Sequence, residues 1–135
     1  MKIYVASSWR NKYQQEVVAQ LREMGHNVYD FKNPPNGSGF QWSEIDLDWQ
    51  KWSAKEYIKA LDSNIALKGY YSDIGAMEWA DCCVLVLPCG RSAHLEAGWF
   101  AGRGKKLYIL TRDGEEPELM ALMATKIITN LEEIP

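Results

Sequence analysis

The sequence predicts an α/β protein: a single-domain, three-layer αβα sandwich around a five-stranded parallel sheet, of the flavodoxin-like or Rossmann-like kind. Short apolar runs alternate with helical patterns along the 135 residues, and this alternation places helices between parallel strands. The run CCVLVL at 82–87 is apolar throughout, as expected of a central strand covered on both faces. The length suits one hydrophobic core, so we expect residues 1–135 to form one domain.

The first thirty residues predict a strand, a helix and a second strand. Residues 2–6 form an apolar run that ends at two serines. Residues 12–24 place apolar side chains at helical spacing, and Gly25 closes this helix. Residues 27–30 predict the second strand.

The middle of the chain is less regular. The segment KNPPNGSG at 32–39 predicts a loop, because it holds two prolines and two glycines. It opens a Trp-rich insertion that covers about 32–53. The tetrad SAKE at 53–56 is a capping box, which predicts a helix over 54–61. A further helix is expected from Ser72 to about Ala80.

Pro88-Cys89-Gly90 ends the apolar strand at 82–87. Ser92 is then expected to cap a helix that runs to Gly102. The rest predicts a strand at 106–111, a short helix at 117–123 and a last strand at 126–128.

Composition excludes several classes of function. The net charge is −3 and no stretch gathers Lys and Arg, so a nucleic-acid polymer is not an expected partner. No apolar run approaches the roughly 20 residues that span a bilayer, and the N-terminus is strand-like rather than a signal peptide. We therefore expect a cytoplasmic protein. A mononucleotide needs only one or two cations, which this chain can supply.

The three cysteines, Cys82, Cys83 and Cys89, form no CxxC pair. His26 and His94 show no metal-ligand spacing with them, so neither a disulfide nor a metal site is expected.

In a doubly wound sheet, ligands bind beyond the carboxyl ends of the strands. Three loops should meet there, at 7–11, 31–39 and 88–92. The first loop contains Ser7, Ser8, Trp9 and Arg10, and with the following helix N-terminus it resembles an anion cradle. The plainer alternative is that Ser8 caps the helix and Arg10 is solvated. The loop is neither a GxGxxG motif nor a P-loop.

The stretch GRSAHLEAG at 90–98 repeats the arrangement of strand, polar turn and helix. Gly90, Arg91 and Ser92 stand at the helix start, where they are candidates for binding substrate. Glu96 follows among small residues and could reach a ligand at the helix N-terminus. The alternative is an acid that only compensates the helix dipole. His94 is a candidate for binding substrate and for acting as an acid or base, although a lone His in a helix is more often a surface or hydrogen-bonded residue.

Two further features precede the central strand. Asp73 is a candidate to face the cleft, whereas Asp81 is expected to fix a loop by hydrogen bonding. Trp42 belongs to an aromatic-rich segment at 40–57, whose rings could stack on a nucleobase or pack at an interface.

Three stretches carry a family resemblance: KIYVASSWRN at 2–11, the Asp73 helix that leads through Ala80-Asp81 into the apolar strand, and GRSAHLEAGWFAG at 90–102. They resemble the nucleoside 2-deoxyribosyltransferase superfamily, including its 2'-deoxynucleoside 5'-phosphate N-hydrolase branch, over most of the chain. The resemblance implies that Glu96, followed by Gly98, is the nucleophile and that Asp73 assists the reaction. It also implies that Ser8 and Arg10 bind the 5'-phosphate.

The chain departs from this family in two places. Gly90 stands where family members usually carry an Asp or Ser about six residues before the nucleophile, and Arg91 and Ser92 are the candidate replacements. The Trp-rich insertion has no evident counterpart.

The resemblance favours an N-glycosidase acting on a nucleoside 5'-monophosphate, without metal or organic cofactor. Deoxyribosyl transfer between bases, cleavage of NAD and a non-catalytic nucleotide sensor remain alternatives. A homodimer or higher homo-oligomer is implied by the resemblance alone.

Overall fold

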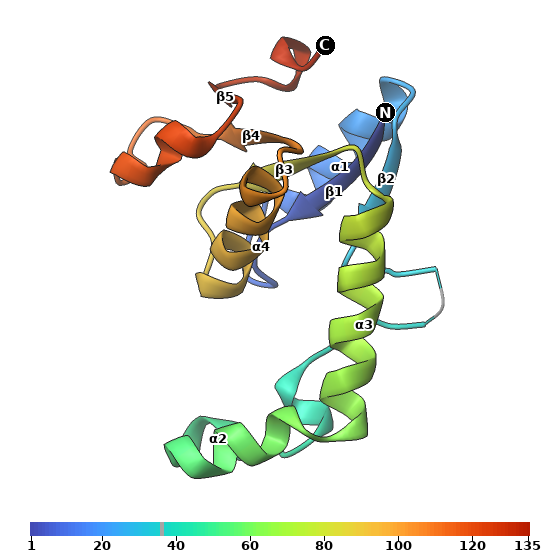
Figure 1. The fold of residues 1–135 in the computed structure, drawn as a ribbon, viewed down its shortest axis with the longest axis vertical. Helices are drawn as coiled ribbons and strands as arrows, with labels where there is room; N and C mark the ends of the chain where they lie inside the picture. Colours follow the sequence, from blue (N-terminus) through green and yellow to red (C-terminus); the bar gives the residue numbers. More distant parts are fainter. Residues whose placement is uncertain (36) are drawn as a thin grey trace. The chain divides into compact units, whose positions relative to one another are not determined.

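The computed structural model describes residues 1–35 and 37–135; Asn36, within the predicted loop at 32–39, lies outside the described residues. The chain divides into two compact units (Figure 1). The first, called here the sheet unit, contains residues 1–30 and 77–135, and the second, the inserted unit, contains residues 31–76.

The sheet unit is built on five parallel strands in the order β2-β1-β3-β4-β5, which confirms the predicted flavodoxin-like order. Strand β1 lies between β2 and β3, so the carboxyl ends of these three strands are neighbours at one edge of the sheet. The strands are β1 (Lys2–Ala6), β2 (Asn27–Asp30), β3 (Cys82–Val86), β4 (Lys106–Leu110) and β5 (Lys126–Ile128).

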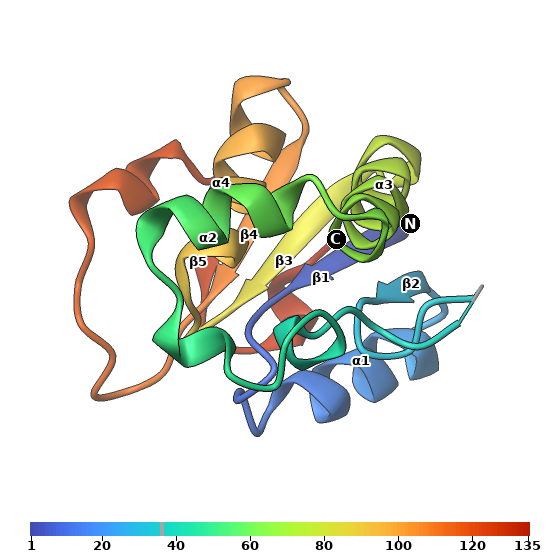
Figure 2. The ribbon, with the colours of Figure 1, turned by 90° about the horizontal axis from the view of Figure 1, so that it is seen from below.

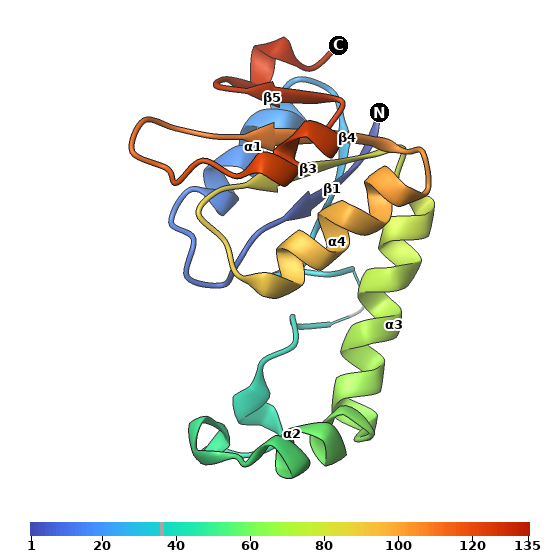
Figure 3. The same cartoon turned by 60° about the vertical axis from the view of Figure 1, so that its left-hand side comes forward.

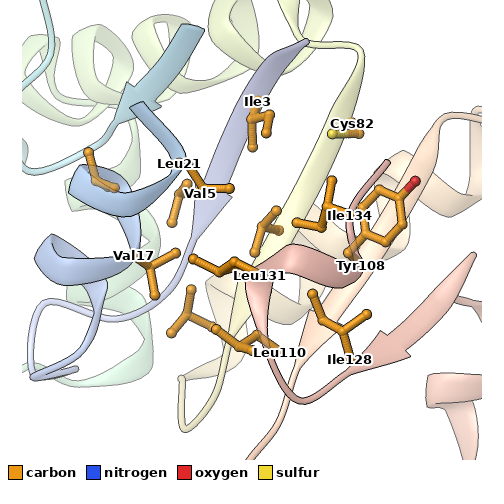
Figure 4. Close-up of a cluster of buried hydrophobic side chains, with 13 residues drawn as sticks. Ile3, Val5, Val17, Leu21, Cys82, Tyr108, Leu110, Ile128, Leu131 and Ile134 are labelled. Atoms are coloured by element: carbon orange, nitrogen blue, oxygen red, sulfur yellow. The ribbon is translucent and has the colours of Figure 1, made fainter. Parts of the chain in front are cut away.

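Helices α1 (Gln14–Glu23) and α4 (Arg91–Gly102) cover opposite faces of this sheet (Figure 2). On the α1 face, side chains of α1 and the 3₁₀ turn η4 (Leu131–Glu133) pack on the strands (Figure 4). On the other face, α4 turns its small residues and Phe100 inward. The three layers predicted from sequence are therefore present in the sheet unit. The packing on the α1 face buries one cluster of apolar side chains, which includes Ile3, Val5, Val17, Leu21, Val84, Leu110, Ile128, Leu131 and Ile134.

The inserted unit contains two short 3₁₀ turns, η1 (Trp42–Glu44) and η2 (Trp49–Lys51), and the helix α2 (Ala54–Leu61). The predicted capping box is confirmed, because Ser53 and Glu56 bond each other's backbone N–H groups at 3.2 and 3.1 Å. Helix α3 (Asn64–Trp79) begins in this unit and ends in the sheet unit.

The prediction that α3 starts at Ser72 is wrong. Ser63 caps the helix instead, since its Oγ accepts a hydrogen bond from the Ala66 N–H (3.2 Å). Gly69 is accommodated inside the helix because Phe40 packs against it. A Cβ added at Gly69 would lie 2.8 Å from the Cβ of Phe40.

One other predicted helix differs in detail. The expected helix at 117–123 is a shorter 3₁₀ turn, η3 (Leu119–Met123). Among the described residues, every helix is too short or too polar to cross a membrane.

Candidate active site

The loops that follow β1 and β3 are joined at the carboxyl edge of the sheet (Figure 3). The Ser7 hydroxyl donates to the Val86 carbonyl (2.9 Å), and Asn11 Nδ2 donates to the Pro88 carbonyl (2.9 Å). The Gly90 N–H donates to Ser8 Oγ (2.5 Å). These contacts confirm that two of the three predicted loops meet. The third predicted loop, 31–39, belongs to the inserted unit, and its part in the site stays a prediction.

The loop after β4, which was not among the three loops predicted at the site, also reaches this edge. The Arg112 guanidinium lies 3.5 Å from the centroid of the Tyr13 ring. Burial and then the carboxylates of Glu96 and Glu115 raise the pKa of the Cys89 thiol to about 12, so Glu115 lies near the loop after β3. Arg112 and Glu115 gave no signal in the sequence, because neither belongs to a recognisable motif.

Glu96 is half-buried and projects from the second turn of α4, where it accepts a hydrogen bond from the Tyr4 hydroxyl at Oε2. Tyr4 itself is fully buried in β1. Its ring stacks on Tyr29 at 5.4 Å and contacts Phe100 at 5.9 Å, which fixes the position of its hydroxyl. The buried tyrosine therefore holds the carboxylate from the sheet side.

This geometry disfavours the alternative role for Glu96, compensation of the helix dipole. Helix α4 begins at Arg91, so Glu96 is its sixth residue and lies beyond the first turn. The helix-dipole effect falls off within that turn.

Two thiols lie near Glu96, and both are held in the neutral form. Burial raises the pKa of Cys83 well above its usual value, and the Glu96 carboxylate raises it further. Cys89 is shifted in the same direction for the same two reasons. A thiol that stays protonated at neutral pH is a poor nucleophile, so the carboxylate is the stronger candidate.

The start of α4 differs from its predicted form. Gly90, not Ser92, is the N-cap residue, and a glycine has no side chain that could cap the helix. Ser92 lies exposed within the first turn because the helix already begins at Arg91. The helix N-terminus thus keeps first-turn N–H groups for an anion.

Arg10 and Arg91 are exposed near these loops. Within the part of the chain that the structure describes, neither forms an ion pair. Together with the hydroxyl of Ser8 they supply the donors that a phosphate requires. Trp9 is also exposed in the loop after β1.

His94 is exposed, and its Nδ1–H donates to the Gly90 carbonyl (2.9 Å) while lying 3.7 Å from Cys89 Sγ. The carbonyl can only accept, which fixes the proton on Nδ1. This bond favours a structural role for His94 over acid–base chemistry.

The two other predicted site residues, Trp42 and Asp73, belong to the inserted unit. The Trp42 ring makes edge contacts with Phe40 (4.8 Å), Trp52 (5.7 Å) and Tyr57 (5.9 Å), so it is the centre of an aromatic cluster. Asp73 lies half-buried in α3. Base stacking by Trp42 and proton transfer by Asp73 stay predictions.

Asp81 has the structural role that the sequence predicted. Its Oδ2 accepts from the Lys2 N–H (2.9 Å), and its own N–H donates to the Lys2 carbonyl (2.8 Å). Both contacts lie at the amino edge of the sheet, away from the candidate site. Across residues 1–35 and 37–135, no three His, Cys, Asp or Glu side chains are grouped as metal ligands are.

The fold and the site define a flavodoxin-like α/β protein that presents a carboxylate, held by a buried tyrosine, on a helix whose N-cap residue is a glycine. Its structure is similar to that of a 2-deoxyribosyltransferase from the psychrotolerant bacterium Bacillus psychrosaccharolyticus, with a TM-score of 0.62 and 18% identity over 99% of this chain and 90% of that one. It is also similar to the CMP N-glycosidase BcmB of Clostridium botulinum, with a TM-score of 0.53 and 15% identity over 98% of this chain and 94% of that one.

No protein-family model and no curated protein matches the sequence. The two similar structures confirm the predicted resemblance at the level of the fold.

Proposed function

We propose that the protein is an N-glycosidase of the nucleoside 2-deoxyribosyltransferase superfamily, which cleaves the base–sugar bond of a nucleoside 5'-monophosphate. The observation that carries this proposal is the hydrogen bond from the buried Tyr4 to Glu96 at the carboxyl edge of the sheet. The fold shared with a 2-deoxyribosyltransferase and a CMP N-glycosidase supports the same class of substrate.

In the proposed reaction a Glu96 oxygen attacks C1' of the sugar. The C1'–N bond breaks, its electron pair leaves with the base, and Asp73 supplies the proton that the base takes up. The transition state has oxocarbenium character, which a nearby carboxylate stabilises. Water then attacks C1', gives one proton back to Asp73, and releases the sugar phosphate and the free Glu96 carboxylate.

The preference for a phosphorylated substrate is inferred from the cations and donors around the helix start. Arg10 and Arg91 supply positive charge, the Ser8 hydroxyl supplies a donor, and α4 presents first-turn N–H groups. A neutral nucleoside would leave the two guanidinium groups without an anionic partner.

Transfer of deoxyribose to a second base is the other candidate, because the TM-score is higher with the 2-deoxyribosyltransferase. The two reactions share the first step and differ in whether water or a base attacks the glycosyl-enzyme.

We also propose a homodimer, as the family resemblance implies. Tyr57, Ile58 and Leu61 expose apolar surface on α2, which a second copy of the chain could cover. Light scattering measures the mass in solution, and a monomer would contradict this part of the proposal.

The test is release of free base, followed by chromatography, from a panel of nucleoside 5'-monophosphates and nucleosides. We expect Glu96→Gln to lower release by roughly three orders of magnitude or more, because loss of a nucleophile removes the covalent route. Glu23→Gln, an exposed acid on α1, is the matched control.

Tight nucleotide binding without base release would contradict the enzyme and favour the sensor. Base exchange that requires a second base would favour transfer over hydrolysis.

A further inference from the structure

Asn11 lies between the loop that carries the proposed phosphate contacts and the loop that leads into the nucleophile helix. Its side chain is nearly inaccessible, with 5% exposure. Nδ2 donates to the carbonyls of Pro88 (2.9 Å) and Val86 (3.3 Å), and Oδ1 accepts from the Tyr13 N–H (2.7 Å). The Asn11 N–H donates to the Ser8 carbonyl (3.0 Å). One residue thus bonds to both loops.

The connection continues into helix α4. Gly90 follows Pro88 by two residues, is the N-cap of α4, and donates its N–H to Ser8 Oγ (2.5 Å). The approach is close, because a Cβ added at Gly90 would lie 3.3 Å from that oxygen. A shift of the loop that contains Ser8 therefore shifts the start of α4.

The proposed nucleophile, Glu96, is hydrogen-bonded to the strand that leads into this loop. The loop containing Ser8 and Asn11 is the direct continuation of β1, and β1 carries the Tyr4 that holds Glu96. The proposed phosphate contacts and the proposed nucleophile are thereby connected through two short routes, one from Asn11 to Pro88 and one from Tyr4 to Glu96.

From these contacts we propose that Asn11 is a positioning residue, through which binding of the substrate's phosphate sets the place of α4 and Glu96. This inference rests on the proposed function. Its physical content is that binding energy from a remote, non-reacting group is used at the reacting centre, which raises kcat instead of only lowering KM.

The experiment divides the substrate into two pieces, a nucleoside and the phosphite dianion. Base release from the nucleoside is measured with and without sodium phosphite. In the wild-type protein, phosphite should accelerate release, because it fills the phosphate site and orders the loops. In Asn11→Ala, this acceleration should fall roughly tenfold or more, since misplacement of reacting groups is costly. Release from the nucleoside alone should change much less.

A second variant guards against loss of folding. Asn11→Ser keeps an acceptor for the Tyr13 N–H but cannot reach both carbonyls, so it should fold and still lose most of the phosphite effect. Asn27→Ala is the matched control, because Asn27 is exposed at the amino end of β2. With the intact nucleotide, the Asn11 variants should lower kcat with little change in KM.

Three outcomes overturn the coupling: no phosphite acceleration in the wild-type protein, unchanged acceleration in both Asn11 variants, or equal losses with and without phosphite. If the wild-type protein releases no base from any substrate, the proposed function fails and the coupling fails with it. Base release with an unchanged phosphite effect overturns the coupling alone.

Discussion

Glu96 receives a hydrogen bond from a tyrosine that water does not reach. A charge-assisted bond of this kind is stronger than one between neutral groups, and here the donor cannot turn away, because two rings pack on it. The contact therefore fixes the direction in which the carboxylate presents its oxygens.

Tyr4→Phe removes this hydroxyl and keeps the ring. We expect kcat/KM for base release to fall roughly 10- to 100-fold, the range for one lost hydrogen bond to a charged group. The melting temperature should change little, because Tyr29 and Phe100 still pack on the ring. Tyr108→Phe, on the opposite face of the sheet, is the control and should keep full activity. An unaltered rate in Tyr4→Phe would remove Tyr4 from the site.

Single residues were predictable from sequence where they belong to a local motif. Ser8, Gly90 and Glu96 stand in short patterns next to a strand end, and the structure places Ser8 and Gly90 in contact. Tyr4 was missed because, within an apolar strand, an aromatic residue is indistinguishable from an ordinary core residue. Asn11 was missed because its partners lie on a strand end and loop far away in the sequence.

At the scale of elements, the ammonium group of one lysine binds the carbonyl groups at the C-terminal end of α3. Lys105 Nζ donates to the carbonyls of Met77 (3.0 Å), Glu78 (2.8 Å) and Ala80 (2.7 Å). The same ammonium lies 5.6 Å from the Trp99 ring centroid, so it also contacts α4. The last carbonyls of a helix have no partner within the helix, and Lys105 supplies one.

Lys105→Met keeps the length of the side chain and removes these bonds. We expect the free energy of unfolding to fall by about 2 kcal/mol, because several carbonyls lose a charged donor together. Urea denaturation measures the change. Lys106→Met is the matched control, since Lys106 is exposed at the start of β4. Equal losses in the two variants would show that Lys105 has no special role.

The elements differ in how far local sequence determines them. Helix α2 was predicted with its observed bounds, because its capping box is a signal confined to four residues. The start of α3 was not predictable in this way. Its cap, Ser63, lacks the acidic partner three residues later, and the contact between Gly69 and Phe40 is tertiary.

At the scale of the whole molecule, the carboxylate of Glu133 links the turn η4 to the last strand of the sheet. Glu133 accepts from the N–H groups of Thr129 (2.8 Å) and Asn130 (3.2 Å) and pairs with Lys126 (3.2 Å). The backbone bonds first, and then Lys126, lower the pKa of Glu133 from 4.5 to about 2. This arrangement holds Leu131 and its neighbours in the core cluster.

A lowered pKa means that the ionised form stabilises the folded state. That contribution is complete above pH 4.5 and is lost as the pH falls toward 2. Glu133→Gln should therefore lower the free energy of unfolding at pH 7 and make its decline between these pH values shallower. Denaturation curves across that range measure both effects.

Glu132→Gln is the control, because Glu132 is the exposed neighbour of Glu133 in the same turn. A variant of Glu133 with the same acid dependence as the unmodified protein would contradict this account.

The overall topology followed from the sequence because the alternation of strands and helices leaves few ways to build a parallel sheet. The arrangement of the Trp-rich insertion at about 32–53 did not follow, since a segment rich in Trp, Gly and Pro has neither a helical nor a strand period.

Parallel pairing of β1 with β3 joins distant parts of the chain, and Ser7 and Val86, which bond at its end, are 79 positions apart. The entropy lost on closing such a long loop grows only logarithmically with its length. Insertions or deletions between Asp30 and Met77 therefore cost the sheet little stability. When the length of the intervening segment changes, Tyr4, Ser8 and Glu96 keep the geometry that the paired strands impose.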